Sequence, residues 1–359
     1  MDKTKTRKKL LAAGRVQGRR RKMTLPKTPT SSRRKKKGKQ RLKTTQPSVE
    51  ELLDLVADCV ENFEYELALQ YCEAALVVAP SNINVLETTG GLLLDFGDIE
   101  RATQCFLTAV EASPEDGHHK YLCLGQLSQG QDAVKYMLKG IDILIKQLHS
   151  QNDLAAASTS TQDATTFDVS TAYCSLAEVY LTDCCFDGDA EVKCGEYCTK
   201  AIEYCPSNPE AYQLMGSYLL SKQDIEKARS TLLQGLLLWL PAPDDDVRQV
   251  PSYQSQVNWS KLLMEVEEYE KAHEVLVHLL REDDEMIEVW YLLGWLAHLQ
   301  NEFSVAVDCL RRCKELHSTG GCEDVQLLNH VDELLEELGD QQHSESEENL
   351  SESDQDMQT

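Results

Sequence analysis

The stretch INVLETTGGLLLDFGDIERATQCFLTAVEASPED, residues 83–116, decides the fold, because its small and apolar residues recur 34 positions away. Ala68 and Ala102 are 34 residues apart, and so are Pro80 and Pro114. The same spacing relates three later pairs: Ala201 and Gly235, Ala272 and Ala306, and Leu276 and Leu310. A fixed period of this length indicates one structural unit repeated many times, so we predict a stack of similar units.

The order of residue types inside the unit predicts two antiparallel helices. Ala, Gly or Ser fits where the two helices cross closely, and Leu, Phe or Tyr fills the space where they diverge. The proline at the end of the unit stops the second helix, since it lacks an amide donor and clashes with the preceding turn. This pattern resembles the tetratricopeptide (TPR) repeat. The resemblance implies an all-α, right-handed superhelical solenoid with one continuous core, built to hold another polypeptide.

The register predicts six or seven repeats and a last helix that caps the stack. The repeats begin near these positions: 49, 83, 117, 170, 209, 253 and 287. Repeats one to three therefore occupy 49–148, and repeats four to seven with the capping helix occupy 170–338. The Ser/Thr/Ala/Gln-rich stretch 149–169 between them is predicted to be a linker loop. An insert of about ten residues, 243–252, separates repeats five and six.

Two repeats depart from the regular pattern. Repeat three keeps a Leu124-Gly125 pair, but its turn is predicted to be short and its second helix long, from Ile141 to Leu148. Repeat four carries about five extra residues in the turn at Cys184–Lys193. The capping helix is predicted from the helical period of five apolar residues: Val325, Leu328, Val331, Leu335 and Leu338.

Composition argues against a membrane span, a secreted protein and a metal site. The sequence holds no run of 18 apolar residues and begins without the apolar core of a signal peptide. Its 13 cysteines are therefore expected to be reduced thiols. Cys194 and Cys198 lie one helical turn apart, but the packing pattern already explains them and no Cys-x-x-Cys pair occurs. We expect no metal and no cofactor.

Charge divides the chain into three zones. Residues 1–43 hold 19 Lys and Arg against one acid, and residues 339–359 hold seven acids and no Lys or Arg. The remaining 44–338 therefore carry 17 bases and 52 acids, a formal charge of −35. Solubility of a small domain needs a charge of only about 2–8. The excess predicts a strongly basic partner.

In TPR arrays the first helix of each pair lines the concave face, so its exposed positions are the candidate contacts for a bound polypeptide. The register places these residues there: Asp54, Glu61, Glu87, Asp95, Glu178, Glu210, Gln213, Glu288, Tyr291 and Trp295. The predicted groove is acidic and has aromatic residues toward its C-terminal end. For any single residue, an ordinary solvated helix surface is an equally good interpretation. A carboxylate clamp of the kind used by chaperone-docking TPR proteins is disfavoured, because glutamates stand where it would need lysines.

The ends are predicted to be disordered. In the basic arm, 1–48, the compact run Arg33, Arg34, Lys35, Lys36, Lys37 and Lys39 resembles a nuclear localisation signal for an import receptor. The alternatives are a nucleic-acid-binding arm, a mitochondrial transit peptide, or an intramolecular occupant of the acidic groove. The tail, 339–359, is acidic and Ser-rich; it is either a target of acid-directed kinases or a plain solubilising segment.

No catalytic pattern occurs: the chain lacks a phosphate-binding Gly-rich loop, a His-Glu-x-x-His motif and a Gly-x-Ser-x-Gly motif. The chain is therefore predicted not to be an enzyme.

Over residues 49–359 the chain resembles the dedicated assembly chaperones of a large-subunit ribosomal protein, the L-four protein. The features that carry the resemblance are the Leu55–Pro80 and Leu86–Pro114 repeats, the Asn208–Tyr212 opening, the Asp244-Asp245-Asp246 insert and the acidic end. The resemblance implies capture of the client's long basic loop in the concave groove and escort to the nucleus.

We therefore predict a non-enzymatic chaperone of a basic ribosomal protein, present in nucleus and cytoplasm. Nucleic acid would be contacted only through the N-terminal arm, and no membrane is involved. The alternative is a constitutive TPR scaffold subunit of an RNA-processing or chromatin complex.

Overall fold

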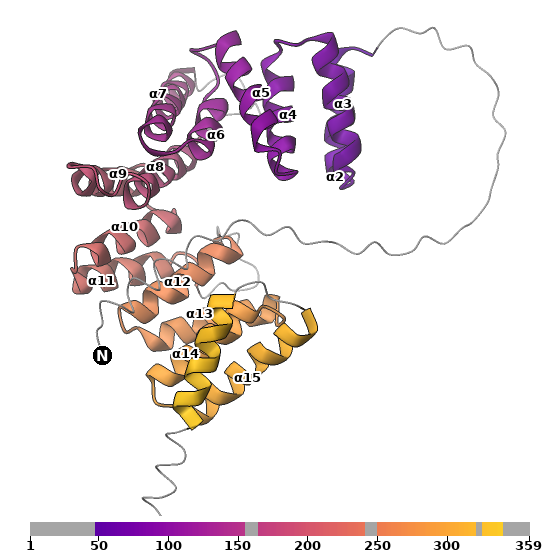
Figure 1. Cartoon of the computed structure of the whole chain (residues 1–359). Coiled ribbons are helices and arrows are strands. Elements are labelled where there is room, and N and C mark those ends of the chain that lie inside the picture. The colour runs from indigo at the N-terminus through magenta and orange to yellow at the C-terminus, as the bar shows by residue number, and fades with distance from the viewer. Residues whose placement is uncertain (1–46, 155–163, 241–249, 321–324, 340–359) are drawn as a thin grey trace, which may run out of the picture. The chain divides into compact units, whose positions relative to one another are not determined.

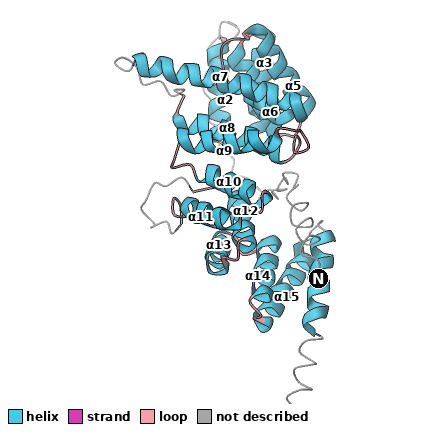
Figure 2. Cartoon of the chain, turned by 90° about the vertical axis from the view of Figure 1, so that its left-hand side faces the viewer, coloured by secondary structure: helices cyan, strands magenta, loops and turns pink. Residues whose placement is uncertain are grey.

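The computed structural model describes residues 47–154, 164–240, 250–320 and 325–339. Within these ranges every regular element is a helix and no strand occurs, which confirms the all-α prediction (Figure 2). The helices follow one another as seven consecutive pairs, coloured from indigo to yellow in Figure 1. We call the first helix of each pair the A helix and the second the B helix.

The A helices are α2 (Val49–Glu61), α4 (Ile83–Asp95), α6 (His119–Leu127), α8 (Thr166–Leu181), α10 (Pro209–Ser221), α12 (Tyr253–Glu265) and α14 (Ile287–Leu299). The B helices are α3 (Tyr65–Val78), α5 (Ile99–Ala112), α7 (Gly130–Leu154), α9 (Ala190–Tyr204), α11 (Ile225–Leu236), α13 (Tyr269–Glu282) and α15 (Phe303–Gly320). Each A helix packs on its own B helix, and each B helix packs on the next A helix. A further helix covers 325–339.

Close crossings inside the pairs explain the small residues of the sequence pattern. A Cβ atom added at Gly90 of α4 would lie 2.7 Å from the ring of Phe106 on α5. At Gly294 of α14, an added Cβ would lie 2.8 Å from Leu310 of α15. Neither separation leaves room for a methyl group, because the opposing side chain is a fully buried core residue. The absence of a Cβ thus lets the two helices approach.

The turn from A helix to B helix has the same backbone conformation in five pairs. One residue adopts a positive φ: Phe63, Gly97, Gln223, Glu267 or Asn301. The following residue then donates its N–H to a carbonyl five residues back, as Asp98 does to Leu93 at 2.8 Å. This left-handed helix end satisfies carbonyl groups that the A helix leaves without partners. It reverses the chain within three residues.

Asparagine caps the A helix after two of the returns from a B helix, at Asn82 and Asn208. Asn208 caps α10 by accepting the N–H of Glu210 at 3.1 Å, and its Nδ2 donates to Ser170 Oγ at 2.9 Å. Ser170 Oγ in turn donates to the carbonyl of Ala201 at 2.7 Å. Asn208 and Ser170 are buried, so these hydrogen bonds tie α8, α9 and α10 together away from water.

The two irregular repeats depart from the regular pattern as predicted, but the bounds differ: α9 already begins at Ala190, inside the turn predicted for Cys184–Lys193. In repeat three the turn is short and the B helix, α7, runs for 25 residues. In repeat four, the connection 182–189 is longer than the three-residue turns of the five regular pairs. Gln131 of α7 holds this longer connection by donating to Asp187, at 2.5 Å.

The predicted linker 149–169 is helical at both ends. Helix α7 continues to Leu154, and α8 already begins at Thr166. A capping box starts α8: Thr165 Oγ1 accepts the N–H of Asp168 at 3.2 Å, and Asp168 Oδ2 accepts the N–H of Thr165 at 2.9 Å. The Ser/Thr-rich composition suggested a loop here, but Thr165 acts as a cap and Val169 is fully buried.

The helix over 325–339 has the position expected of a cap. Val331, Leu334 and Leu338 pack in one cluster with Leu310 and Cys313 of α15. Residues 1–46 of the basic arm, the Asp244-Asp245-Asp246 insert and residues 340–359 of the acidic tail lie outside the described residues.

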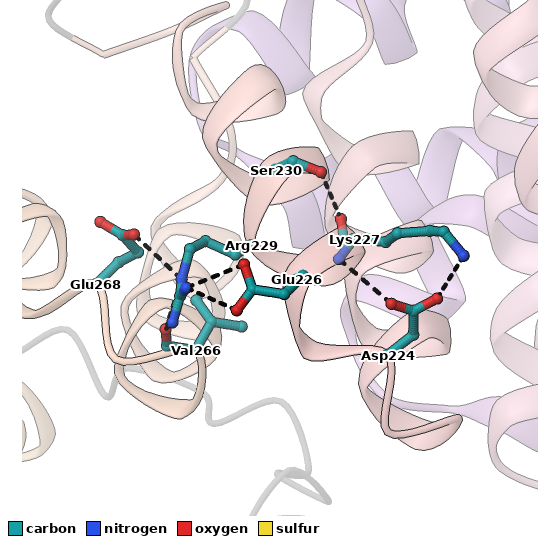
Figure 3. A network of polar contacts seen from close by, with 7 residues as sticks. All are labelled: Asp224, Glu226, Lys227, Arg229, Ser230, Val266 and Glu268. Carbon is teal, nitrogen blue, oxygen red and sulfur yellow. Dashed lines mark hydrogen bonds and ion pairs between the residues drawn. The ribbon is translucent and has the colours of Figure 1, made fainter.

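Arg229 of α11 joins repeat five to repeat six, as Figure 3 shows. Its Nη2 and Nε donate to the carbonyl of Val266 at 2.8 and 3.1 Å, and its Nε lies 3.3 Å from Glu268 Oε1. Its Nη1 donates to Glu226 at 3.1 Å. The guanidinium therefore satisfies the carbonyl at the end of α12 and pairs with Glu226 of α11 and with Glu268, the N-cap residue of α13.

We expect Arg229→Met to lower the free energy of unfolding by about 1.5–3 kcal/mol, because hydrogen bonds from a charged donor to a half-buried carbonyl are lost. Arg312→Met is the matched control: this exposed arginine pairs with Glu315 at 3.1 Å within one helix, and its loss should lower stability by less than about 1 kcal/mol. Urea denaturation of both variants measures the difference. Equal effects would show that the contact with Val266 adds nothing.

Candidate functional site

An open cleft lies between the A helices α6 and α8. Leu122 and Gln126 of α6 form one side, Thr171 and Ser175 of α8 form the other, and Met137 of α7 forms the floor. Its volume is about 250 Å³. The cleft exists because α6 has only nine residues, while the long helix α7 packs on both α6 and α8.

A second hollow of about 330 Å³ continues the first. It shares Gln126, Met137 and Ser175 with the first and adds the acidic side chains of Glu178 and Asp183. The combined surface thus has an apolar floor and an acidic edge. Such a surface fits the aliphatic stem and the charged head of a lysine or arginine side chain.

Two carboxylates on neighbouring A helices dominate the electrostatics of this region. Burial raises the pKa of Glu178 on α8, although its side chain keeps an exposed surface. A concave position explains both observations, because protein atoms surround the carboxylate on most sides while one side stays open to water. Burial also raises the pKa of Glu210 on α10, and the charge of Glu178 raises it further. No described cation offsets either effect, so this pair attracts a positive group from outside.

Glu87 of α4 lies near His119 and Lys120 of the adjoining repeat. Its Oε2 lies 3.8 Å from Nδ1 of His119, and its buried Oε1 has no hydrogen-bond partner among the described residues. The fully buried Lys120 donates its Nζ to the carbonyl of Asp116. Burial lowers the pKa of Lys120, and the charge of Glu87 opposes that shift. The predicted groove residue Glu87 is therefore also a counter-charge for a buried lysine.

Cys123, His119 and Glu87 lie in a row that superficially resembles a nucleophile with its base. The Sγ of Cys123 is 3.6 Å from Nε2 of His119. However, burial, with a further contribution from the charge of Glu87, raises the pKa of Cys123 to about 11. The thiol therefore stays protonated at neutral pH and is not an activated nucleophile.

Three predicted acidic residues are exposed on the first two A helices. Asp54 and Glu61 lie on α2, and Asp95 is the last residue of α4. Their side chains are open to solvent, as a contact role requires, and they remain predictions.

The structure corrects the role assigned to Gln213. Its side chain is 7% exposed, its Nε2 donates to the carbonyl of Ser255 at 3.0 Å, and its Oε1 accepts from Ser255 Oγ at 2.7 Å. Gln213 thus joins α10 to α12 and is not available to a partner. The charge of Glu288 is also engaged, because Lys261 Nζ donates to its carboxylate at 2.7 Å.

The predicted aromatic platform is half-buried against the last helix. The Tyr291 hydroxyl and Nδ1 of His330 are 2.7 Å apart, and the ring centres of Trp295 and His330 are 4.5 Å apart. Trp295 and Tyr291 therefore help to attach the helix over 325–339. The register identified Tyr291 and Trp295 as facing residues but could not show that the capping helix lies over them.

Sequence reasoning missed the cleft itself. Thr171, Ser175 and Glu178 follow one another at spacings of three and four residues, which places them on one face of α8. That spacing was visible in the sequence, but the opening beside it results from the short α6 and the long α7.

The remaining predicted site residues, the basic run from Arg33 to Lys39, lie outside the described ranges. Within those ranges, no cluster of three or more His, Cys, Asp or Glu side chains is placed to hold a metal ion, and each cysteine is a free thiol. None of the described helices combines the length and apolar character that a membrane span requires.

Comparison with known proteins identifies the class and then the family. Two family models described as tetratricopeptide repeat match residues 197–230 and 287–317. Together with the repeated helix pairs, these matches define a TPR protein whose A helices carry the acidic cleft.

Curated relatives extend over most of the chain. It is 30% identical over 335 residues to a Schizosaccharomyces pombe protein named probable assembly chaperone of rpl4, covering 86% of this chain and 97% of that one. A protein of the same name from Emericella nidulans is 29% identical, covering 82% and 83%. A solved structure of an assembly chaperone of RpL4 (Acl4), residues 1–338, matches with a TM-score of 0.64 and 30% identity over 71% of this chain and 98% of that one. The chain belongs to the family of rpl4 assembly chaperones.

The raised pKa of Glu178 predicts a distinct pH dependence of stability. Between its ordinary value of 4.5 and the raised value, the unfolded chain loses the proton first, so the free energy of unfolding falls as pH rises. Glu178→Gln removes this loss. We expect the variant to match the wild type near pH 4 and to be more stable at pH 7.5.

Asp224→Asn is a control that is expected to change the stability in the opposite direction. The hydrogen bond from Lys227 lowers the pKa of Asp224, so its contribution to stability is present above the ordinary value of 3.8 and is lost as pH falls through the lowered value. This variant should be less stable than the wild type at pH 7.5 and should approach it at low pH. Urea denaturation at several pH values measures both. A Glu178→Gln variant no more stable than the wild type at pH 7.5 would contradict the concave placement of this carboxylate.

Proposed function

We propose that this protein is a non-enzymatic assembly chaperone of the ribosomal protein rpl4, and that it binds a basic segment of that client along its acidic A helices. The membership of the chain in the family of rpl4 chaperones supports the identity of the client. The observation that carries the mode of binding is the pair Glu178 and Glu210, two carboxylates that burial disfavours and that no described cation neutralises.

A ribosomal protein is built to contact RNA phosphates, so its client segments are rich in lysine and arginine. The carboxylates of the A helices would take the place of those phosphates before assembly. Charge-assisted hydrogen bonds to Glu178 and Glu210 would then relieve the desolvation that both carboxylates experience in the free protein. The negative charge of residues 44–338 would also speed the encounter with a basic client.

The double variant Glu178→Gln and Glu210→Gln tests this mode of binding. We expect it to bind rpl4 about tenfold or more weakly in titration calorimetry, and to be at least as stable as the wild type, because a strained pair of charges is removed. Weaker binding therefore cannot result from unfolding. Glu100→Gln, at an exposed site on the B helix α5, is the matched control and should leave the affinity unchanged.

The dependence of affinity on salt concentration distinguishes this electrostatic mode of binding from an apolar one. Affinity of the wild type for rpl4 should fall as ionic strength rises, because exposed ion pairs are screened within about 10 Å at 0.1 M salt. The double variant should show a shallower dependence. If both proteins bind rpl4 equally and with the same salt dependence, the acidic A-helix surface is not the client site, while the family assignment is unaffected.

We further propose that the chain shuttles between cytoplasm and nucleus and that the run from Arg33 to Lys39 is recognised by an import receptor. The compact basic sequence supports this role. Replacing Lys35, Lys36 and Lys37 by alanine should make a fluorescent fusion cytoplasmic, whereas replacing Lys3, Lys5 and Lys8 should not. Nuclear fluorescence that persists in the first variant would favour a nucleic-acid-binding role for the arm.

A further inference from the structure

The first A helix exposes a position that is covered in later pairs. The position in question is the residue that precedes, in the sequence, the point where an A helix crosses its B helix. In α4, for example, it is Thr89, which precedes Gly90. This residue is buried in most of the stack: Thr89 is 0% exposed, Leu124 1%, Leu176 0%, Trp259 0% and Leu293 8%. The equivalent residue of α2, Leu55, is 38% exposed.

The difference arises from the neighbour that each position meets. Thr89 of α4 lies beside Cys72 of the preceding B helix, α3. Trp259 of α12 lies against Gly235 of the preceding B helix, α11, where an added Cβ would be 2.8 Å from its ring. No described B helix precedes α2. Leu55 is apolar, as are most of the residues at this position in later pairs, but α2 has no described preceding B helix on which Leu55 could pack.

The outer positions of α3 are also unusually apolar. Leu67, Val77 and Val78 are 37%, 85% and 47% exposed. Two other B helices hold mostly charged residues at these repeat positions: Arg101, Glu111 and Ala112 in α5, and Lys271, Arg281 and Glu282 in α13. Two others keep one exposed apolar residue each, Leu237 at the end of α11 and Val305 of α15. These apolar side chains share the outer face of α3 with the exposed residues Glu66, Gln70 and Glu73. Repeat one therefore exposes apolar side chains on both of its helices, α2 and α3.

The charge of repeat one is entirely of one sign. Residues 49–82 hold eight acids and no Lys, Arg or His. Glu51 and Asp58 stand four residues before and three residues after Leu55, so they flank it on the same face of α2. Both are exposed. A partner for this face must bring apolar side chains together with positive charge.

We propose that the end surface of repeat one, defined as Leu55, Leu67, Val77, Val78, Glu51 and Asp58, docks a basic amphipathic helix of another polypeptide. The partner is a helix because a B helix occupies this position in the later pairs. It is basic because every charge on repeat one is negative. This surface shares no residue with the Glu178 and Glu210 site, so the proposal stands independently of the function proposed above.

A fluorescein-labelled peptide of about 18 residues tests the proposal, with leucine at i, i+3, i+4 and i+7 and lysine elsewhere. A peptide of the same composition in scrambled order is the control for charge alone. The full-length chain is compared with Leu55→Gln and with Val192→Gln, which changes an apolar residue 61% exposed on α9. Fluorescence anisotropy at about 0.15 M salt gives the affinities, and thermal melting confirms that both variants fold.

We expect the amphipathic peptide to bind the wild type and Val192→Gln equally, and Leu55→Gln about tenfold or more weakly. The scrambled peptide should bind all three weakly. Equal affinity for Leu55→Gln and Val192→Gln, or equal binding of both peptides, would overturn the proposal. Binding that appears only after residues 1–46 are removed would also overturn it, because the occupant would then be the chain's own N-terminal segment. A dimer in sedimentation that Leu55→Gln abolishes would overturn it too, because the occupant would then be a second copy of the chain.

Discussion

The close crossing of two helices within each pair is the constraint on which the rest of this structure depends. Gly90 against Phe106 and Gly294 against Leu310 allow two helix backbones to approach until a large side chain fills the space that a missing Cβ leaves. A pair that crosses in this way buries only part of its apolar surface. Its B helix must therefore pack on the next A helix, and this requirement makes the units stack.

Stacking has an electrostatic consequence for the A helices. It brings α8 and α10 together, so Glu178 and Glu210 are surrounded by protein and by each other's charge. The fold tolerates this arrangement because one side of the carboxylates stays open to water. A surface that disfavours its own charge in the free state is ready to accept a positive group, and this readiness lowers the stability of the chain while the site is empty.

The A helices are not equivalent as binding surfaces. Toward the C-terminal end they are occupied by the chain itself: Gln213 is bound to Ser255, Glu288 is paired with Lys261, and the last helix lies against Trp295. Open carboxylates remain on α2, α4, α8 and α10. Contacts within the chain therefore engage the predicted residues of α14 and one of those on α10, whereas the carboxylates of α2, α8 and the end of α4 stay open to solvent.

The sequence alone determined the repeating unit, the helix pairs and the sign of the surface charge. It could do so because a small residue at a crossing and an asparagine at a cap act within one repeat, and because an excess of acids can be counted from the composition. The short turn of repeat three and the long turn of repeat four were predictable for the same reason.

Only the tertiary structure decided which of the predicted groove residues are free. Gln213 and Glu178 both occupy A helices and are both polar, yet one is bound to Ser255 and the other faces an opening. The helical extension past His149 and the cap at Thr165 were hidden by a loop-like composition. Whether a predicted groove residue is free depends on contacts between different repeats, such as those of α10 with α12 or of α14 with the last helix. A periodic pattern does not encode which side chains meet in such contacts.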